Sequence, residues 1–530
     1  MTGTLALLRS QLLRDRLRCP IWVFGIAIMA GYFANGVKLM LDQPESLSAM
    51  MTNPAGVVFM GPAPSNGEIS LAWILGGGYC LYLAIAAGVM SVLTITRHCR
   101  LEEQSGRLEL IRAQPVSRLA PLISASLLTL LMNLAIIPLT ALVLQASGYG
   151  MADGLAYGVA VAGVGVAFAG VAALTSQITQ TSRSAAGIAG ALLGASFLLR
   201  GIGDMSRSEQ GDWGWLSLLT PNGWAQRIEP LTSNNLVWAI GPMIVWLGGT
   251  TLATVLSTRR DLGAGAIQPR PGKPAASRYL ASPFSLALRL QRGSLLGWSI
   301  TLLLTGLTYG LFTNSLADSL GNSPQYLKLL GGDATALENG YIALLALIMG
   351  LCVSAFAVMS VQALHAEEKT GRIEAVLASA ISRSRWVASW LASTATSSIF
   401  LLIIAGFSAG LGASLSGSSN QLLGRSIVAH LAYIPACWLT AAVAVLLYGL
   451  RPALTGLSWL LVVFGLLAGL FGALLSWSSG LIDLSPYEAV GRLPLDSVNW
   501  IAVGTLLILC AIFTGLALTI FRRRDLKPAT

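Results

Sequence analysis

Two segments of the sequence place the same charged residues at the same spacing. Residues 102–118 read EEQSGRLELIRAQPVSR, and residues 367–383 read EEKTGRIEAVLASAISR. Paired glutamates, a Gly-Arg step and a third glutamate favour ion pairs and charge-assisted hydrogen bonds with a partner protein. We call these segments the first and the second cassette, and the chemistry that they suggest is docking.

The cassettes belong to a longer internal repeat. One shift of about half the chain superposes Glu102, Glu103, Gly106, Arg107, Glu109, Ala113, Ser117 and Arg118 on Glu367, Glu368, Gly371, Arg372, Glu374, Ala378, Ser382 and Arg383. The tetrapeptide RRDL occurs at 259–262 and again at 523–526. Membrane topology requires basic inner loops but no glutamates or glycine at fixed spacing, so the repeat indicates two related halves with a shared task. The simpler alternative, a pair of solvated charged loops, stays open.

Each cassette is predicted to form a short amphipathic helix. Glu103 and Arg107 lie four residues apart, as do Glu368 and Arg372, which is the spacing of an ion pair on a helix. An apolar stripe on each helix is expected from Leu108, Ile111, Ile373, Val376 and Leu377. One face would then hold the helix on the protein and leave the other for a partner.

The residues that follow each helix suggest where the next element begins. Pro115 is predicted to end the first helix, and Ser117 and Ser382 are placed to cap the helices that come next. The second cassette has Ala380 at the position of Pro115, so the two need not be equivalent.

The elements that position the cassettes are membrane spans. Apolar residues make up 54% of the chain, charged residues only 11%, and the mean hydropathy is +0.70. A span needs roughly 20 mostly apolar residues. About twelve stretches qualify: 20–40, 71–96, 119–147, 151–178, 184–200, 236–258, 295–316, 339–364, 386–414, 427–450, 453–475 and 499–521. The sequence therefore predicts an all-α polytopic membrane protein.

The net charge is +10, and the basic residues that produce it are distributed in relation to the spans. Arginines gather in alternate loops and at both termini, which places the cassettes and the termini on the cytoplasmic side of the cell membrane. The basic excess also attracts anionic lipid head groups, and nucleic acid is not expected as a partner. The first apolar stretch lacks a cleavage site of small residues, and the six scattered cysteines form no metal or disulfide pattern.

Each half contains six spans, so both copies have the same orientation and a pseudo-two-fold axis along the membrane normal relates them. We expect a first half at 1–262, a cytoplasmic linker rich in Gly, Pro, Ala and Ser at 263–283, and a second half at 284–530. A central pathway between the halves would follow.

At the cassettes the chain resembles the coupling-helix segment of type-2 ABC exporter permeases. The pattern E-E-x-[ST]-G-R-x-E followed by [AP]-[VI]-S-R stands between the second and third of six spans, and LTPNGW and RRDLGAG flank the sixth. The twelve-span tandem form is similar to actinobacterial permeases that export polyketide antibiotics and other drugs. The second half has SPYEAV where the first has TPNGWA.

The resemblance implies a fold and a set of roles. An amphipathic elbow helix would precede each half, at 8–19 and 286–296, and a short outer element would precede the last span, at 213–231 and 481–493. Coupling to the ATPase subunit would fall to Glu102, Glu103, Gly106, Arg107, Glu109, Ser117 and Arg118 in the first half, and to Glu367, Glu368, Gly371, Arg372, Glu374, Ser382 and Arg383 in the second.

The chain has no recognisable ATP site. A P-loop requires G-x-x-x-x-G-K-[ST], whereas Gly272-Lys273 is followed by Pro274 and preceded by Ile267 at the first glycine position. We therefore expect no enzyme activity and no cofactor on this chain. ATP and Mg²⁺ would bind to a separate ATPase subunit, with one copy on each cassette.

Two other functions compete with an ABC permease. A proton-coupled multidrug transporter would also show twelve spans and a repeat, but it needs ionisable residues at mid-membrane depth, where this sequence has almost none. His430 lies near the end of a predicted span, and His98 and His365 lie in inner loops, so all three are expected to be structural. A membrane scaffold or sensor would give no reason for two cassettes.

The cargo is predicted only as a class. If spans two, five, eight and eleven line the pathway, they offer Trp73, Tyr79, Tyr82, Phe197, Tyr341, Phe356, Trp459 and Phe464. An aromatic and weakly polar surface suits amphipathic or lipophilic compounds such as drugs, polyketide antibiotics or lipids. Glycines in the spans, at 163, 165, 187, 190 and 194, are expected to permit close helix packing.

Overall fold

A computed structural model describes residues 2–38, 57–58, 60–62, 70–208, 211–267, 275, 277, 280, 282–313, 334–417, 421–472 and 477–524. All regular elements in these residues are helices. Twelve are long and apolar enough to cross a membrane: Arg18–Lys38, Leu71–Gln104, Ala120–Ala146, Met151–Ile178, Ser182–Ser208, Leu236–Arg259, Pro283–Leu311, Leu337–Lys369, Arg383–Leu415, Gln421–Leu450, Pro452–Leu470 and Trp500–Arg523. The predicted all-α polytopic fold is confirmed.

The chain divides into two compact units, Met1–Gly272 and Lys273–Thr530. Most of the stretch predicted as a linker, 263–283, lies outside the described residues. Its first five residues belong to the first unit, because the backbone N–H groups of Ala266 and Ile267 donate to the carbonyls of Gln177 and Ile178. The first half therefore packs residues beyond its last span against the end of α10 (Met151–Ile178).

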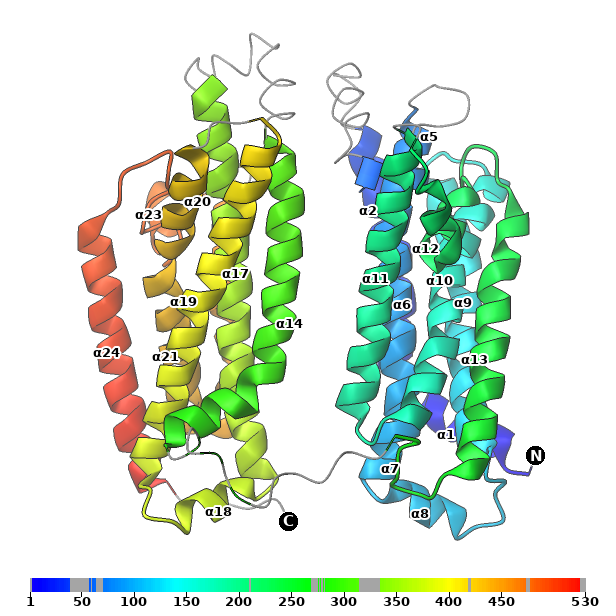
Figure 1. Cartoon of the computed structure of the whole chain (residues 1–530), viewed down its shortest axis with the longest axis horizontal. Helices are drawn as coiled ribbons and strands as arrows, with labels where there is room; N and C mark the ends of the chain where they lie inside the picture. Colours follow the sequence, from blue (N-terminus) through cyan, green and yellow to red (C-terminus); the bar gives the residue numbers. More distant parts are fainter. Residues whose placement is uncertain are drawn as a thin grey trace. The chain divides into compact units, whose positions relative to one another are not determined.

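The long helices of the first unit run side by side in a bundle, and the short helix α8 (Arg107–Arg112) lies across one end of it (Figure 1). In chain order its elements are α1 (Thr4–Arg14), α2 (Arg18–Lys38), α5 (Leu71–Trp73), a π-helical segment (Ile74–Tyr79), α6 (Cys80–Thr96), a second π-helical segment (Arg97–Leu101), α7 (Glu102–Gln104), α8 (Arg107–Arg112), α9 (Ala120–Ala146), α10 (Met151–Ile178), α11 (Ser182–Ser208), a 3-10 segment (Gly214–Leu219), α12 (Pro221–Arg227), a second 3-10 segment (Leu236–Ala239) and α13 (Ile240–Arg259). The run from α5 to α7 is one continuous span.

Helix α10 is the centre of the first unit because its small residues allow neighbours to approach closely. A Cβ atom added at Gly158 would lie 2.7 Å from the Cα atom of Ile137 on α9, and one at Gly170 would lie 2.6 Å from the Cα atom of Trp246 on α13. Gly187, Gly190 and Gly194 do not pack closely against their own unit, because no atom lies within 4 Å of a Cβ added at any of them. These three lie on the part of α11 that faces away from its own unit.

The second unit repeats this plan, with differences at the end opposite its cassette. Its elements are α14 (Pro283–Leu311), α17 (Ala334–Lys369), α18 (Arg372–Leu377), α19 (Arg383–Leu415), α20 (Gln421–Leu431), α21 (Ile434–Leu450), a 3-10 segment (Pro452–Ser458), α22 (Trp459–Leu466), a π-helical segment (Leu467–Phe471), α23 (Ser479–Asp483) and α24 (Trp500–Arg523). Glycines again permit close packing, since a Cβ atom at Gly310 would meet the carbonyl oxygen of Ala409 at 2.2 Å.

The two predicted elbows differ from each other. In the first unit, α1 is a separate helix that exposes Leu5 and Leu13 and buries Gln11, whose amide donates to the Ser124 hydroxyl at 3.0 Å. In the second unit no break separates the elbow from the span, because α14 runs without interruption from Pro283. Ser282 caps this longer helix and Pro283 occupies its first turn. One continuous helix therefore stands where a separate elbow and span were expected.

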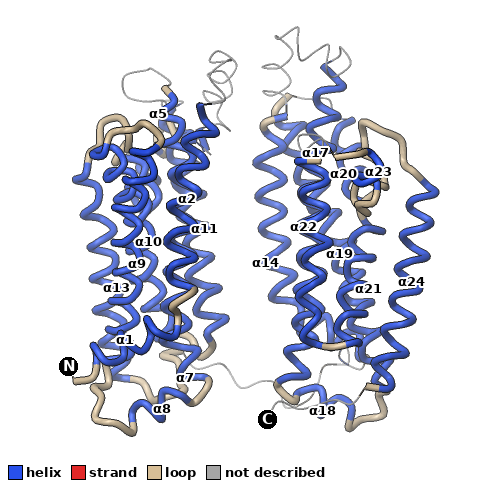
Figure 2. The backbone as a smooth tube through the Cα atoms, turned by 180° about the vertical axis from the view of Figure 1, so that it is seen from behind, coloured by secondary structure: helices blue, strands red, loops and turns tan. Residues whose placement is uncertain are grey.

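In each unit the cassette lies at one end of the bundle, which we call the cassette end. Figure 2 shows α1, α7 and α8 at the same end of the first unit, and α18 with the first turns of α14 at one end of the second. The predicted outer element of the first unit is helical, since α12 packs on α6, α10 and α11. Its counterpart at 481–493 is mostly turns after α23.

Candidate functional site: the anchored cassettes

Both cassettes have the same backbone shape. The preceding helix ends at Gln104 or Lys369, and then Gly106 and Gly371 adopt a left-handed conformation, each with φ 72°, before the short helix begins. This turn explains why the predicted pairs are wrong. Because Gly106 breaks the helix, Arg107 lies 3.7 Å from Glu102 instead of pairing with Glu103. Likewise Arg372 lies 3.1 Å from Glu367 and not beside Glu368.

Replacing Gly106 with alanine is expected to destabilise the first cassette by about 1–2 kcal/mol, since L-residues other than Asn and Asp strongly disfavour this conformation. No atom lies within 4 Å of the added Cβ, so the effect comes from the backbone alone. Thermal unfolding of the purified variant in detergent measures it. Gly106→Asn is the matched control and should lose much less stability, whereas an equal loss in both variants would contradict a conformational cause.

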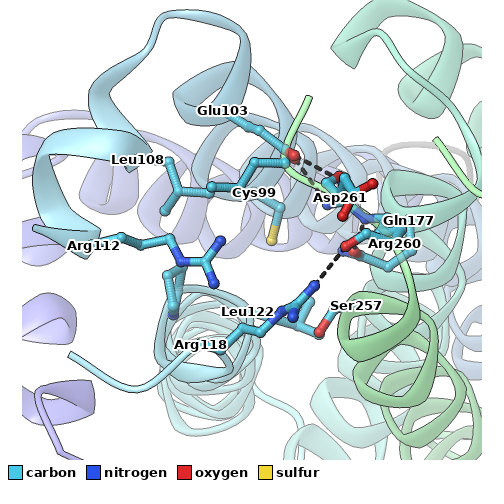
Figure 3. Close-up of a pocket in the computed structure, with 12 residues that line it drawn as sticks. Cys99, Glu103, Leu108, Arg112, Arg118, Leu122, Gln177, Ser257, Arg260 and Asp261 are labelled. Carbon is cyan, nitrogen blue, oxygen red and sulfur yellow. Dashed lines mark hydrogen bonds and ion pairs between the residues drawn. The ribbon is translucent and has the colours of Figure 1, made fainter. Parts of the chain in front are cut away.

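Glu103 is buried in a cluster of arginines at the cassette end (Figure 3). Its two carboxylate oxygens accept hydrogen bonds of 2.7 and 2.8 Å from Arg260, which follows α13, in a bidentate arrangement. Arg100 donates to the same carboxylate at 2.6 Å, and the backbone N–H of Gly263 donates at 2.7 Å. The cluster therefore ties the cassette to the residues that leave the last span of its half.

The second unit builds the same cluster with fewer charges. The carboxylate of Glu368 pairs with Arg524, which follows α24, and accepts a hydrogen bond from the Tyr448 hydroxyl. The Arg524 guanidinium lies 4.8 Å from the centre of the Tyr448 ring and 5.0 Å from that of Phe521. Tyr448 thus takes the place that Arg100 has in the first unit.

A second repeated contact completes each cluster. Arg118 donates to the backbone carbonyl of Arg260 at 2.5 Å, and Arg383 donates to that of Arg524 at 2.8 Å. Arg260 and Arg524 are the second arginines of the two RRDL segments, and sequence reasoning did not connect them with the cassettes. The signal was present, because both segments repeat with nearly the same shift as the glutamates.

The other residues that the sequence assigned to the cassettes differ in burial and in their contacts. Glu102 is buried and forms an ion pair with Arg14 of α1, which joins the elbow to the first cassette. Ser382 caps α19 as predicted, accepting from the N–H of Arg385 at 3.3 Å. The capping prediction is wrong for Ser117, because α9 begins only at Ala120, with Pro121 in its first turn.

One part of each cassette does not contact the buried cluster around Glu103 or Glu368. The anchors of the short helices are Leu108 and Ile373, both buried as the apolar stripes predicted. Arg107 and Arg372 have side chains 63% and 67% exposed. Glu109, Leu110, Glu374 and Ala375 are exposed as well, and among the described residues neither Glu109 nor Glu374 has an ion-pair partner. We call these residues the outer faces of α8 and α18.

The eight aromatic residues predicted to line a pathway have different environments. Phe356 is fully buried and Trp73 is 6% exposed, so neither offers surface to a cargo in this conformation. The other six are partly exposed: Tyr79, Tyr82, Phe197, Tyr341, Trp459 and Phe464. Several engage neighbours of their own unit, such as Tyr341, whose hydroxyl donates to the Tyr309 carbonyl at 2.9 Å.

Comparison with known proteins identifies the family of this chain. Residues 280–522 match the family model "Multidrug efflux system permease Rv1217c, C-terminal domain". Over 538 aligned residues the chain is 34% identical to the multidrug efflux system permease protein Rv1217c of Mycobacterium tuberculosis, covering 99% of this chain and 96% of that protein. The chain belongs to the multidrug efflux permease family. A multidrug efflux permease with twelve apolar helices is a multi-pass membrane protein and a transport subunit rather than an enzyme. As a permease of an efflux system, it works with other components.

Proposed function

We propose that the chain is the permease subunit of an ATP-driven ABC exporter. Two copies of a separate ATPase subunit dock on the outer faces of α8 and α18, on the cytoplasmic side of the cell membrane. ATP and Mg²⁺ are held by those subunits. The cargo is an amphipathic or lipophilic compound, and the alternative of a proton-coupled transporter is tested below.

This proposal rests on the repeated cassette residues that make no contact in the turn or in the buried cluster. Glu103, Gly106 and Arg118, with their counterparts in the second half, serve the turn and the cluster. Glu109 and Glu374 contact neither and are exposed, although their charge and position are the same in both halves. An acidic residue in a first helical turn stabilises the helix dipole by only about 0.3–1 kcal/mol. Docking of a basic partner surface gives a stronger reason for both.

The buried clusters connect each cassette mechanically to the helix ends of its own unit. A short helix that only floated on the surface could move without the spans, whereas Glu103–Arg260 and Glu368–Arg524 link each cassette directly to the residues after the last helix of its unit. The Glu102–Arg14 pair links the first cassette to the elbow as well. Movement of a docked ATPase would therefore shift α8 or α18 together with the helix ends around it.

The purified chain alone is expected to hydrolyse no ATP, since its sequence contains no P-loop. Co-expression with its cognate ATPase should give a stable complex whose ATPase activity rises with transported drug. A phosphate-release assay on both preparations measures this. ATP hydrolysis by the isolated chain, or failure of a complex to form, would contradict the assignment.

Export is also expected to persist when the proton gradient is collapsed while ATP is maintained. Among the described spans, α11 does hold a buried ion pair, Arg200–Asp204, but it lies about 27–33 Å along the helix from Ser182, at the end opposite the cassettes. Arg200 also donates to Gln226 and to the carbonyl of Val58, which is a structural environment. Drug efflux from proteoliposomes with a protonophore provides the test, and loss of export there would favour the secondary transporter.

A further inference from the structure

A groove at the cassette end of the first unit is not used by the clusters. It has a volume of about 520 Å³ and lies between the start of α2, the end of α6, and the first turns of α11. Its walls combine two kinds of surface. Trp22, Leu93, Met132 and Ala186 are apolar, whereas Arg18, Arg97 and Arg183 bring three positive charges to one place.

Only one of these charges is matched. Buried Asp15 also lines the groove, but its carboxylate is 3.1 Å from Arg97 and 2.7 Å from His98, so its negative charge is already paired. Arg18 and Arg183 are exposed, and within the described residues neither forms an ion pair. Ser182, the first residue of the 27-residue helix α11, also lines the groove, and the N-terminus of a helix adds positive potential. The groove therefore favours an anion.

The apolar wall of the groove lies beside its arginines. It is formed by Trp22, Leu93, Met132 and Ala186, and Leu93 is 46% exposed. A ligand with a negative head and a hydrocarbon chain can pair with the arginines and cover this apolar wall at the same time, which inorganic phosphate cannot.

The second unit lacks this combination. In the register that superposes Trp22 on Trp298, Gln291 stands where Asp15 does and Ser294 where Arg18 does. The cassette shift places Gln362 at the position of Arg97. The charges of the groove are therefore specific to the first half and do not follow from the repeat.

We propose that this groove binds an anionic phospholipid of the adjacent leaflet, with its phosphate between Arg18 and Arg183 and an acyl chain along the apolar wall of the groove. Basic pockets between spans on the cytoplasmic side are a recognised place for such head groups. The site goes beyond the proposed function, since it is separate from the cassettes' outer faces and its test needs no ATPase.

Native mass spectrometry of the full chain in detergent, titrated with phosphatidylglycerol, tests the site. Each of Arg18→Gln and Arg183→Gln is expected to weaken the tightest lipid-binding step about fivefold, and the double variant about 25-fold, from roughly 1 kcal/mol per basic residue. Arg385→Gln, an exposed arginine at the cassette end of the second unit, is the matched control and should leave binding unchanged. An equal loss in Arg385→Gln would show a general surface effect and overturn the proposal.

Three further arms separate the ligand sources. Phosphatidylcholine with the same acyl chains should bind much more weakly, and inorganic phosphate should not compete at concentrations near the lipid Kd. Ala186→Trp, which fills the groove, should lose binding while keeping the thermal stability of the lipid-free protein. Equal binding of phosphatidylcholine, competition by phosphate, or displacement of the lipid by a transported drug would each overturn the assignment, the last by making the groove a cargo site.

Discussion

Glu103→Ala is expected to destabilise the first unit by about 3–5 kcal/mol, because removing one partner of a buried ion pair leaves charges without compensation. Here two guanidinium groups lose their common carboxylate, and their side chains are only 0% and 12% exposed for Arg100 and Arg260. Hydrolysis by a bound ATPase should also no longer drive transport at the normal ratio. Thermal unfolding in detergent and drug transport per ATP in proteoliposomes measure the two effects.

The second unit offers a cleaner version of this experiment, since Glu368 pairs with one arginine. Glu368→Gln and Arg524→Gln should each be destabilising, and the double variant should cost less than the sum by about 0.5–3 kcal/mol, the coupling expected of residues in contact. Additive losses would show that the pair does not act as a unit. Glu374→Ala, a change on the outer face of α18, should leave stability within about 0.5 kcal/mol of the parent.

In contrast to Glu103→Ala, charge reversal on the outer faces is expected to leave stability unchanged and to weaken binding of the ATPase. Glu109→Lys together with Glu374→Lys should keep the permease folded and inserted, because both side chains are exposed and lie outside the spans. Binding of the ATPase should fall severely, since an interfacial charge pair that loses a partner costs about 2–5 kcal/mol and a reversal adds repulsion. Co-purification and surface-binding kinetics measure the loss.

The single variants make this prediction specific. Each should retain one docking position and bind about one ATPase per permease, whereas the double variant binds none. Glu109→Gln with Glu374→Gln is the milder control and should show an intermediate affinity. A doubly reversed permease that assembles and exports like the parent would mean that the outer faces are only solvated.

The sequence was sufficient for features that depend on local composition. The twelve spans follow from hydropathy, and the two halves follow from the repeated cassettes. The buried positions of Leu108 and Ile373 follow from helical periodicity. Span ends were less reliable: α11 continues to Ser208 although its apolar stretch stops near Arg200, because Asp204 neutralises that arginine inside the bundle.

The contacts between distant segments were not predictable in the same way. Glu103 and Arg260 are separated by 157 positions, so no local spacing relates them. Local spacing instead indicated Arg107 as the partner, and the left-handed turn at Gly106 prevents that pair. The consequence for the site is large. Glu103 and Glu368 hold the fold, and the exposed glutamates, which we propose meet the ATPase, are the less noticeable Glu109 and Glu374.

Site-specific photocrosslinking tests the central proposal, that the outer faces of α8 and α18 receive the ATPases, most directly. A photoactivatable residue replaces Leu110 or Ala375, both exposed on those faces, and Trp213, 62% exposed in the loop that follows α11, serves as the control position. In membranes that contain the cognate ATPase, both cassette positions should crosslink to it and Trp213 should not. Absence of ATPase crosslinks from both Leu110 and Ala375 would contradict the account.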